Sequence, residues 1–209
     1  MASKSTTVEE LLGRAIDHVN EGRNERARAL CEHAAAAYAP HPAVHQLLAV
    51  LDLKQGAIEP ARQHAQASLA LRPDHLPTLT LAADAARAAG APAEARRALE
   101  RIVALAPGNA DAWFALALVR QDVRDLAAAA DALRALLRLQ PARAEAWVNL
   151  GIVLQESARI DDAMNAYARG FQLREDTFGR IAHALAAPNI GRLWLNLDDL
   201  RNTLRGLPA

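Results

Sequence analysis

The sequence is poor in several features that particular classes of protein need. Its 209 residues include one cysteine, Cys31, so no disulfide can form within the chain, as expected in a reducing compartment. Aromatic residues make up only 4%, and glycine and proline contribute ten residues each, while 52% of the residues are apolar. The apolar fraction therefore comes largely from small side chains and leucine, a composition that favours close-packed helices over sheets.

An excess of charge of one sign is also missing. Lysine plus arginine and aspartate plus glutamate number 24 each, so no global field draws the protein to nucleic acid or acidic lipid. The N-terminal segment has no apolar run long enough for a secretion signal, and no window approaches a membrane span. These absences predict a cytoplasmic protein that neither inserts into membranes nor binds nucleic acid.

What the sequence has instead is a period of 34 residues. Pro73, Pro107 and Pro141 are spaced by this interval. A repeated interval of this length is typical of stacked-repeat proteins, so it takes precedence over local patterns. One register of the period holds alanine five times, at Ala27, Ala61, Ala95, Ala129 and Ala163.

Each period is predicted to form a helix, a tight turn and a second helix. Apolar residues recur at helical spacing, and a glycine register interrupts them near the middle of the period. This register holds Gly22, Gly56 and Gly90, and then Arg124 and Ala158. Prolines near expected helix starts, where the missing N–H has no intrahelical acceptor, are Pro42, Pro77 and Pro92.

The fourth and fifth periods carry the clearest motif, which reads W-x2-L-A from Trp113 and W-x2-L-G from Trp147. With these residues the chain resembles the tetratricopeptide repeat family. The first period departs from the pattern, because Arg14 and His18 stand where apolar residues are usual, and the fifth ends in Glu175 instead of proline. Other residues that fit the motif are Leu116, Ala117, Ala129, Leu133, Pro141, Leu150, Gly151, Ala163 and Tyr167.

The resemblance implies an all-α fold, a right-handed α-solenoid of five tetratricopeptide-like helical hairpins with a C-terminal capping helical segment. Residues 1–7 are expected to be a disordered N-terminus, and residues 178–209 a non-repeat helical cap. The expected repeats span about 8–41, 42–75, 76–109, 110–143 and 144–177.

The resemblance also implies that the first helix of each hairpin lines a concave groove, where partners bind. Most residues of three first-helix registers are apolar, so we expect an apolar groove. Phe114, Leu118 and Ile152 are the strongest candidates for exposed contacts. If the register is wrong by one residue, these side chains belong to the core between repeats. The full set is Leu12, Ile16, Val19, Gln46, Val50, Leu53, Thr80, Asp84, Arg87, Phe114, Leu118, Gln121, Val148, Ile152 and Gln155.

Two groove types known in the family do not fit. A clamp for a C-terminal carboxylate uses several basic and amide side chains, and only Arg87 meets that need, beside Asp84. An asparagine ladder needs asparagine in successive repeats, and only Asn149 stands in that register. An apolar groove suits an amphipathic helix or an extended apolar segment of a partner protein.

Candidate catalytic or metal-binding residues are few. His41 and His45 stand four residues apart, but a helix start is expected between them and no third ligand is evident. Cys31 falls in a register of large residues and is expected to be a buried core residue without an activating partner. The sequence therefore predicts no metal, no cofactor and no enzymatic activity.

The last segment departs from the period. Pro188 is expected to cut short one further helix, and Asn189 to begin another whose apolar residues follow at spacings of three and four. This helix is expected to cap the fifth repeat, and the alternative is that it occupies a groove. The residues expected to make these tail contacts are Leu193, Trp194, Leu197, Leu200 and Leu204.

Three functions remain open at the level of sequence. The leading hypothesis is a non-enzymatic scaffold or adaptor that binds a protein segment in its groove. The second is an oligomerisation module whose groove is filled by its own tail or by that of a neighbouring copy. The third is an accessory subunit that docks a partner enzyme onto its substrate.

Overall fold

The structure, a computed structural model, describes residues 7–186 and 197–207. The described residues form helices and turns and contain no strand, which confirms the all-α class. The chain divides into two compact units, residues 1–105 and 106–209.

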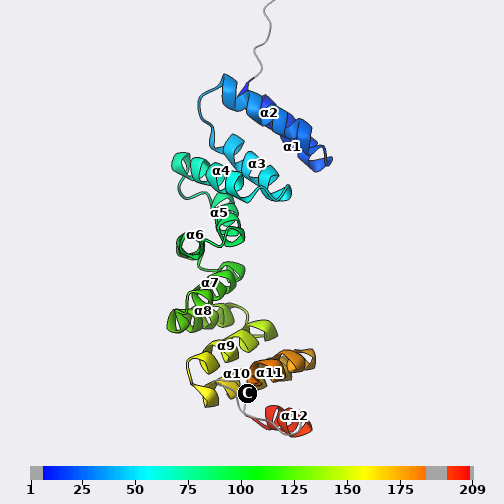
Figure 1. Cartoon of the computed structure of the whole chain (residues 1–209), viewed down its shortest axis with the longest axis vertical. Helices are drawn as coiled ribbons and strands as arrows, with labels where there is room; N and C mark the ends of the chain where they lie inside the picture. The colour runs from blue at the N-terminus through cyan, green and yellow to red at the C-terminus, as the bar shows by residue number, and fades with distance from the viewer. Residues whose placement is uncertain (1–6, 187–196, 208–209) are drawn as a thin grey trace, which may run out of the picture. The chain divides into compact units, whose positions relative to one another are not determined.

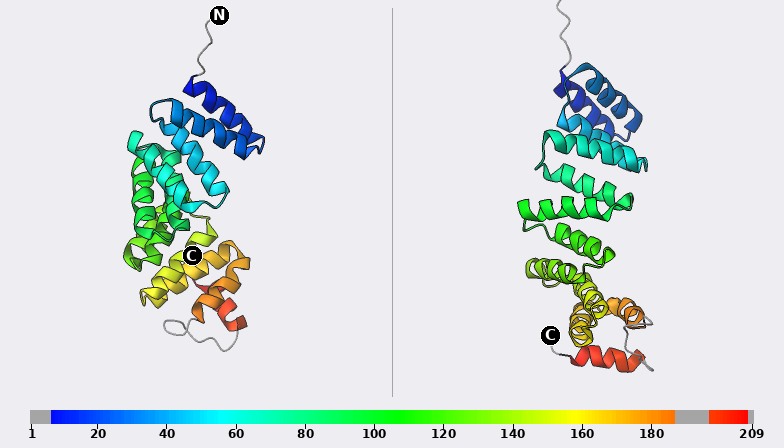
Figure 2. Two further views of the ribbon diagram at one scale, coloured as in Figure 1. Left: turned by 45° about the horizontal axis from the view of Figure 1, so that its top comes forward. Right: turned by 60° about the vertical axis from the view of Figure 1, so that its left-hand side comes forward.

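The first unit consists of three helical hairpins. Each hairpin pairs two consecutive helices, and the hairpins stack through contacts of α2 with α3 and of α4 with α5 (Figures 1 and 2). The helices are α1 (Val8–Asn20), α2 (Asn24–Ala37), α3 (Pro42–Lys54), α4 (Ile58–Leu71), α5 (Leu76–Ala88) and α6 (Pro92–Leu105).

The second unit contains two further hairpins and a shorter terminal part. The hairpins are formed by α7 with α8 and by α9 with α10, and α8 packs on α9 (Figure 1). A single 3-10 turn leads from α10 into α11. The elements are α7 (Ala110–Asp122), α8 (Leu126–Leu139), α9 (Ala144–Glu156), α10 (Ile160–Leu173), η1 (Glu175–Thr177), α11 (Phe178–Leu185) and α12 (Leu197–Gly206).

Helix starts follow the local chemistry of the sequence. Pro42 and Pro77 lie in the first turns of α3 and α5, and Pro92 is the first residue of α6, as predicted. Thr7 and Glu10 form a capping box at α1. The side chain of Asn109 accepts a hydrogen bond from the Ala112 N–H and so caps α7.

The turn inside each hairpin requires one residue with positive φ. Gly22, Gly56 and Gly90 adopt φ values of 75°, 72° and 66°. Arg124 and Ala158 adopt the same conformation, with φ of 63° and 60°, although a side chain makes it unfavourable by about 1–2 kcal/mol. All five hairpins therefore have the same turn conformation. The replacement of glycine by Arg124 and Ala158 makes that conformation less favourable but does not change it.

Small residues in the first helices allow the paired helix to approach closely. Ala15, Ala49, Ala83 and Ala117 are buried in this register. At Gly151 the ring of the fully buried Tyr167 lies so close that an added Cβ would be 2.4 Å from two ring carbons. Tyr167 thus fills the volume that a methyl group occupies in the other repeats.

The C-terminal helix α12 is part of the packed core of the second unit. It packs on α10 and α11, and Leu200 and Leu204 are fully buried there (Figure 2). The amide of Gln172 donates to the carbonyl oxygens of Leu204 and Leu207 at 3.4 and 3.0 Å. Leu197 remains exposed, and Leu193 and Trp194 lie outside the described residues. The described part of the tail therefore caps the last hairpin, as favoured from the sequence.

Candidate functional site

Four predicted groove residues meet in one hollow between α1 and α3. Leu12, Ile16, Gln46 and Val50 line a concave pocket of about 220 Å³, together with Ala43 and Leu47. Leu12 is buried and forms part of its floor, whereas Ile16 is 48% exposed. The hollow is apolar apart from one amide, and it presents a large aliphatic side chain to water.

The groove residues of α5 have a different character. Thr80, Asp84 and Arg87 are all exposed, and the Thr80 hydroxyl donates to the Leu76 carbonyl at 3.1 Å. Val19 and Leu53 are half-buried. The apolar surface of the first unit is therefore concentrated at α1 and α3, and α5 adds polar groups.

In the second unit the expected apolar contacts are partly covered by polar side chains. Phe114, Leu118 and Ile152 are half-buried. The guanidinium of Arg143 lies 4.7 Å from the centre of the Phe114 ring, a cation–π contact. Gln121 is also half-buried and donates to Glu156 at 2.9 Å. A partner would have to displace or share these groups, so this surface is less apolar than the sequence predicts.

In the second unit two predicted groove residues are in the core, so the prediction is wrong for them as open contacts. Val148 is fully buried and faces Gly170 of α10. Gln155 is buried, and it accepts a hydrogen bond from the Tyr167 hydroxyl at 2.8 Å and donates to the Ala184 carbonyl at 2.7 Å. The second bond explains the error, because α11 packs against α9 and covers this position.

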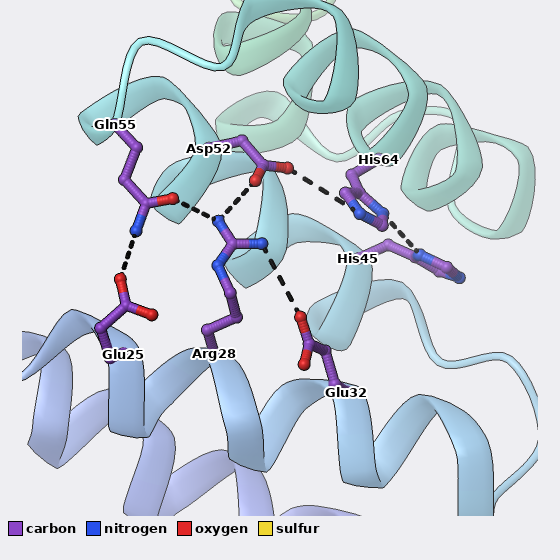
Figure 3. A network of polar contacts seen from close by, with 7 residues as sticks. All are labelled: Glu25, Arg28, Glu32, His45, Asp52, Gln55 and His64. Carbon is purple, nitrogen blue, oxygen red and sulfur yellow. Dashed lines mark hydrogen bonds and ion pairs between the residues drawn. The ribbon is translucent and has the colours of Figure 1, made fainter.

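A network of polar side chains joins the first two hairpins (Figure 3). Asp52 on α3 is buried, and the guanidinium of Arg28 on α2 donates to its Oδ1 at 2.5 Å. This hydrogen bond is the main reason that the pKa of Arg28 is raised. Gln55 accepts from Arg28 at 3.0 Å and donates to Glu25 at 2.8 Å. Sequence reasoning missed this site, because its residues come from three different helices.

Two histidines extend the network to α4. His64 Nε2 lies 3.8 Å from Asp52 Oδ2, and the Nδ1 atoms of His64 and His45 are 3.4 Å apart (Figure 3). Burial, and secondarily the neighbouring His64, lower the pKa of His45. Among the described residues no group of three potential ligands could hold a metal ion. The network is suited to holding α2, α3 and α4 together.

Cys31 is a core residue, as predicted. It is buried in α2, and burial raises the pKa of its thiol to about 11. At neutral pH it is therefore a thiol, and a thiol is a poor nucleophile.

No helix in the described part of the chain is long and apolar enough to cross a membrane.

Comparison with known proteins identifies the repeat. Tetratricopeptide repeat family models match residues 76–119 and 115–178. Among solved structures, YrrB, a TPR protein with an unusual peptide-binding site, superposes with a TM-score of 0.81 at 15% identity, over 87% of this chain and 93% of YrrB. The MamA protein superposes with a TM-score of 0.74 at 16% identity, over 81% of this chain and 93% of MamA. Among curated protein sequences, none matches this chain.

Proposed function

Because the chain belongs to the tetratricopeptide repeat family, we propose that it is a non-enzymatic scaffold that binds an apolar or amphipathic segment of a partner protein. The binding surface is formed by the first helices of the hairpins. Its most favourable part is the hollow between α1 and α3.

The observation that carries the proposal is the exposure of Ile16 beside an apolar floor. A volume of about 220 Å³ accommodates one or two aliphatic side chains of a partner but not a separate small domain. A helix with leucines at spacings of three and four can insert such side chains from one face. Binding would remove the exposed half of Ile16 from water, which contributes about 1 kcal/mol.

Peptide binding by this fold is supported by the structural neighbour YrrB, which is described as having an unusual peptide-binding site. The tail-filled alternative gains less support. Leu200 and Leu204 are buried where α12 packs on α10 and α11, so these side chains are not available to fill a groove in another copy.

The proposal is tested with a fluorescently labelled amphipathic peptide that carries leucines at helical spacing, and with a scrambled peptide of the same composition. Fluorescence anisotropy is measured for the wild type and for Ile16→Ser. We expect the substitution to weaken binding about fivefold, because it removes apolar contact area without changing the fold.

Leu71→Ser is the matched control. Leu71 is 46% exposed at the end of α4, close to the value for Ile16, and does not line the hollow. Its substitution should leave the affinity unchanged. Equal losses for both variants, or equal binding of the scrambled peptide, would show that the hollow is not the binding site. Light scattering on the free chain tests the oligomerisation alternative, which requires a self-associated species.

A further inference from the structure

Each unit also has a cleft on the side of its second helices. The first-unit cleft lies between α4 and α6, over α5, and has a volume of about 300 Å³. The second-unit cleft lies between α8 and α10, over α9, and has a volume of about 610 Å³. Six residues of each lining occupy corresponding positions, two periods apart. Gln66 corresponds to Arg134, Leu79 to Trp147, and Glu94 to Asp162.

An ion pair crosses the first-unit cleft. Arg62 on α4 donates to Glu94 on α6 at 2.8 Å, and Gln66 adds a second hydrogen bond to Glu94 at 3.4 Å. These bonds join the two walls of the first-unit cleft and occupy both carboxylate oxygens of Glu94.

The second-unit cleft lacks the residue that makes this bond, because Ala130 stands in the position of Arg62. Arg134 pairs with Asp131 on its own helix at 2.8 Å. Arg159 pairs with Asp162 at 2.7 Å, within one turn of the same segment. Neither ion pair crosses the cleft, and its volume is about twice that of the first-unit cleft.

The lining of the second-unit cleft combines positive charge with an apolar floor. Arg134, Arg159 and Arg169 line it, and the first two are paired with the carboxylates of Asp131 and Asp162. Arg169 forms no hydrogen bond or ion pair within residues 7–186 and 197–207. The floor of the cleft includes the buried Leu150 and Leu154 and the half-buried ring of Trp147. The indole N–H of Trp147 already donates to the Pro141 carbonyl at 2.8 Å.

We propose that the second-unit cleft binds an acidic segment of a partner protein, with a carboxylate on Arg169 and an apolar side chain on Trp147. Carboxylates match the arginine groups in charge and in hydrogen-bond geometry. Nucleic acid fits less well, because one aromatic ring offers no stacking platform and the chain has zero net charge. This site is independent of the hollow between α1 and α3.

The probe is a labelled peptide rich in glutamate and aspartate with one central leucine, and its matched comparison replaces the acidic residues by their amides. Anisotropy titrations use the full chain at low and at physiological salt. We expect the acidic peptide to bind more tightly than the amide peptide, with an affinity that falls as salt is added, because partly exposed ion pairs are screened. Arg169→Gln should weaken binding about fivefold.

Arg138→Gln is the control, since Arg138 is exposed on α8 one turn beyond Arg134 and does not line the cleft. Its affinity should stay within about twofold of the wild type. A second readout is the emission of Trp147 in a Trp113→Phe/Trp194→Phe background, which should shift when the acidic peptide binds. Equal binding of both peptides, equal losses at Arg138 and Arg169, or preferential binding of a single-stranded oligonucleotide would overturn the proposal.

Discussion

At the scale of single residues, the repeat requires a particular backbone conformation at some positions and a side chain of limited volume at others. The left-handed turn residue is glycine in three hairpins, and Arg124 and Ala158 adopt the same conformation with a Cβ. One position in each first helix holds a small residue. At Gly151 this residue can only be glycine, because Tyr167 leaves no room for a methyl group. Two substitutions test these constraints.

Ala158→Gly should stabilise the second unit by about 0.5–1 kcal/mol. Glycine removes the left-handed strain, although it also raises the entropy of the unfolded chain, which offsets part of the gain. Urea unfolding followed by tryptophan fluorescence measures the change. The control Ala127→Gly, in the first turn of α8, should instead destabilise the unit by up to about 1 kcal/mol. A urea midpoint of Ala158→Gly below that of the wild type would show that the positive φ at Ala158 does not cost stability.

Gly151→Ala should destabilise the second unit by about 1–3 kcal/mol, although alanine is normally the better helix former. The reason is that the alanine Cβ would lie 2.4 Å from two carbon atoms of the Tyr167 ring. Gly13→Ala is the comparison, because no heavy atom lies within 4 Å of its added Cβ in the exposed face of α1. It should raise stability, and circular dichroism during urea unfolding reports both variants. Stabilisation by both would show that the packing at Tyr167 adjusts without cost.

At the scale of elements, every hairpin needs a neighbour to cover its apolar face. In the second unit α11 contacts α9, and α12 contacts α10 and α11. Arg201 and Arg205 of α12 also lie over the rings of Phe178 and Phe171, at 4.4 and 5.8 Å from the ring centres. The tail is therefore an integral part of this unit.

Leu204→Ala should lower the free energy of unfolding of the second unit by about 2–4 kcal/mol, because it leaves a cavity between α12 and α10. Leu197→Ala removes the same atoms from a side chain that is 56% exposed and should change it by less than about 0.5 kcal/mol. Chemical denaturation followed by fluorescence compares them. Similar small effects would mean that α12 does not cap α10 in solution.

At the scale of the whole molecule, the histidines whose pKa is lowered are distributed unevenly between the two units. Loss of hydration is the main cause that lowers the pKa of His18, His45 and His75, and all three lie in the first unit. A histidine with a lowered pKa in the folded state binds fewer protons than in the unfolded state. Such a histidine therefore contributes its full share of folding stability at pH values above about 6.5, which is the pKa of histidine in the unfolded chain. This contribution declines as the pH falls below that value.

Acidification from about pH 7.5 to pH 5 should therefore destabilise the first unit more than the second. All three tryptophans belong to the second unit, whereas circular dichroism reports helices of both. The urea midpoint by circular dichroism should fall more than the midpoint by tryptophan fluorescence. His45→Gln should reduce the difference, and parallel shifts of the two signals in the wild type would refute the assignment.

The candidate groove shows where prediction from sequence succeeds and where it stops. The period, together with the groove that the family resemblance implies, predicts Leu12, Ile16 and Val50 on one surface, and the structure brings them together in one hollow. Val148 and Gln155 occupy equivalent registers but are buried, because α10 and α11 pack on them. A register fixes which residues share a face of a helix, but not which element covers that face.

The sequence by itself determined the helical class and the repeat, because these depend on the spacing of residues along the chain, and it favoured a capping tail while leaving a groove-bound tail open. The tertiary structure decided the rest. The ion pair between Arg62 and Glu94 and the network around Asp52 join side chains of different helices, and their geometry depends on how those helices pack. Exposure and pairing, which determine where a partner can bind, are therefore properties of the packed hairpins and not of the repeat pattern.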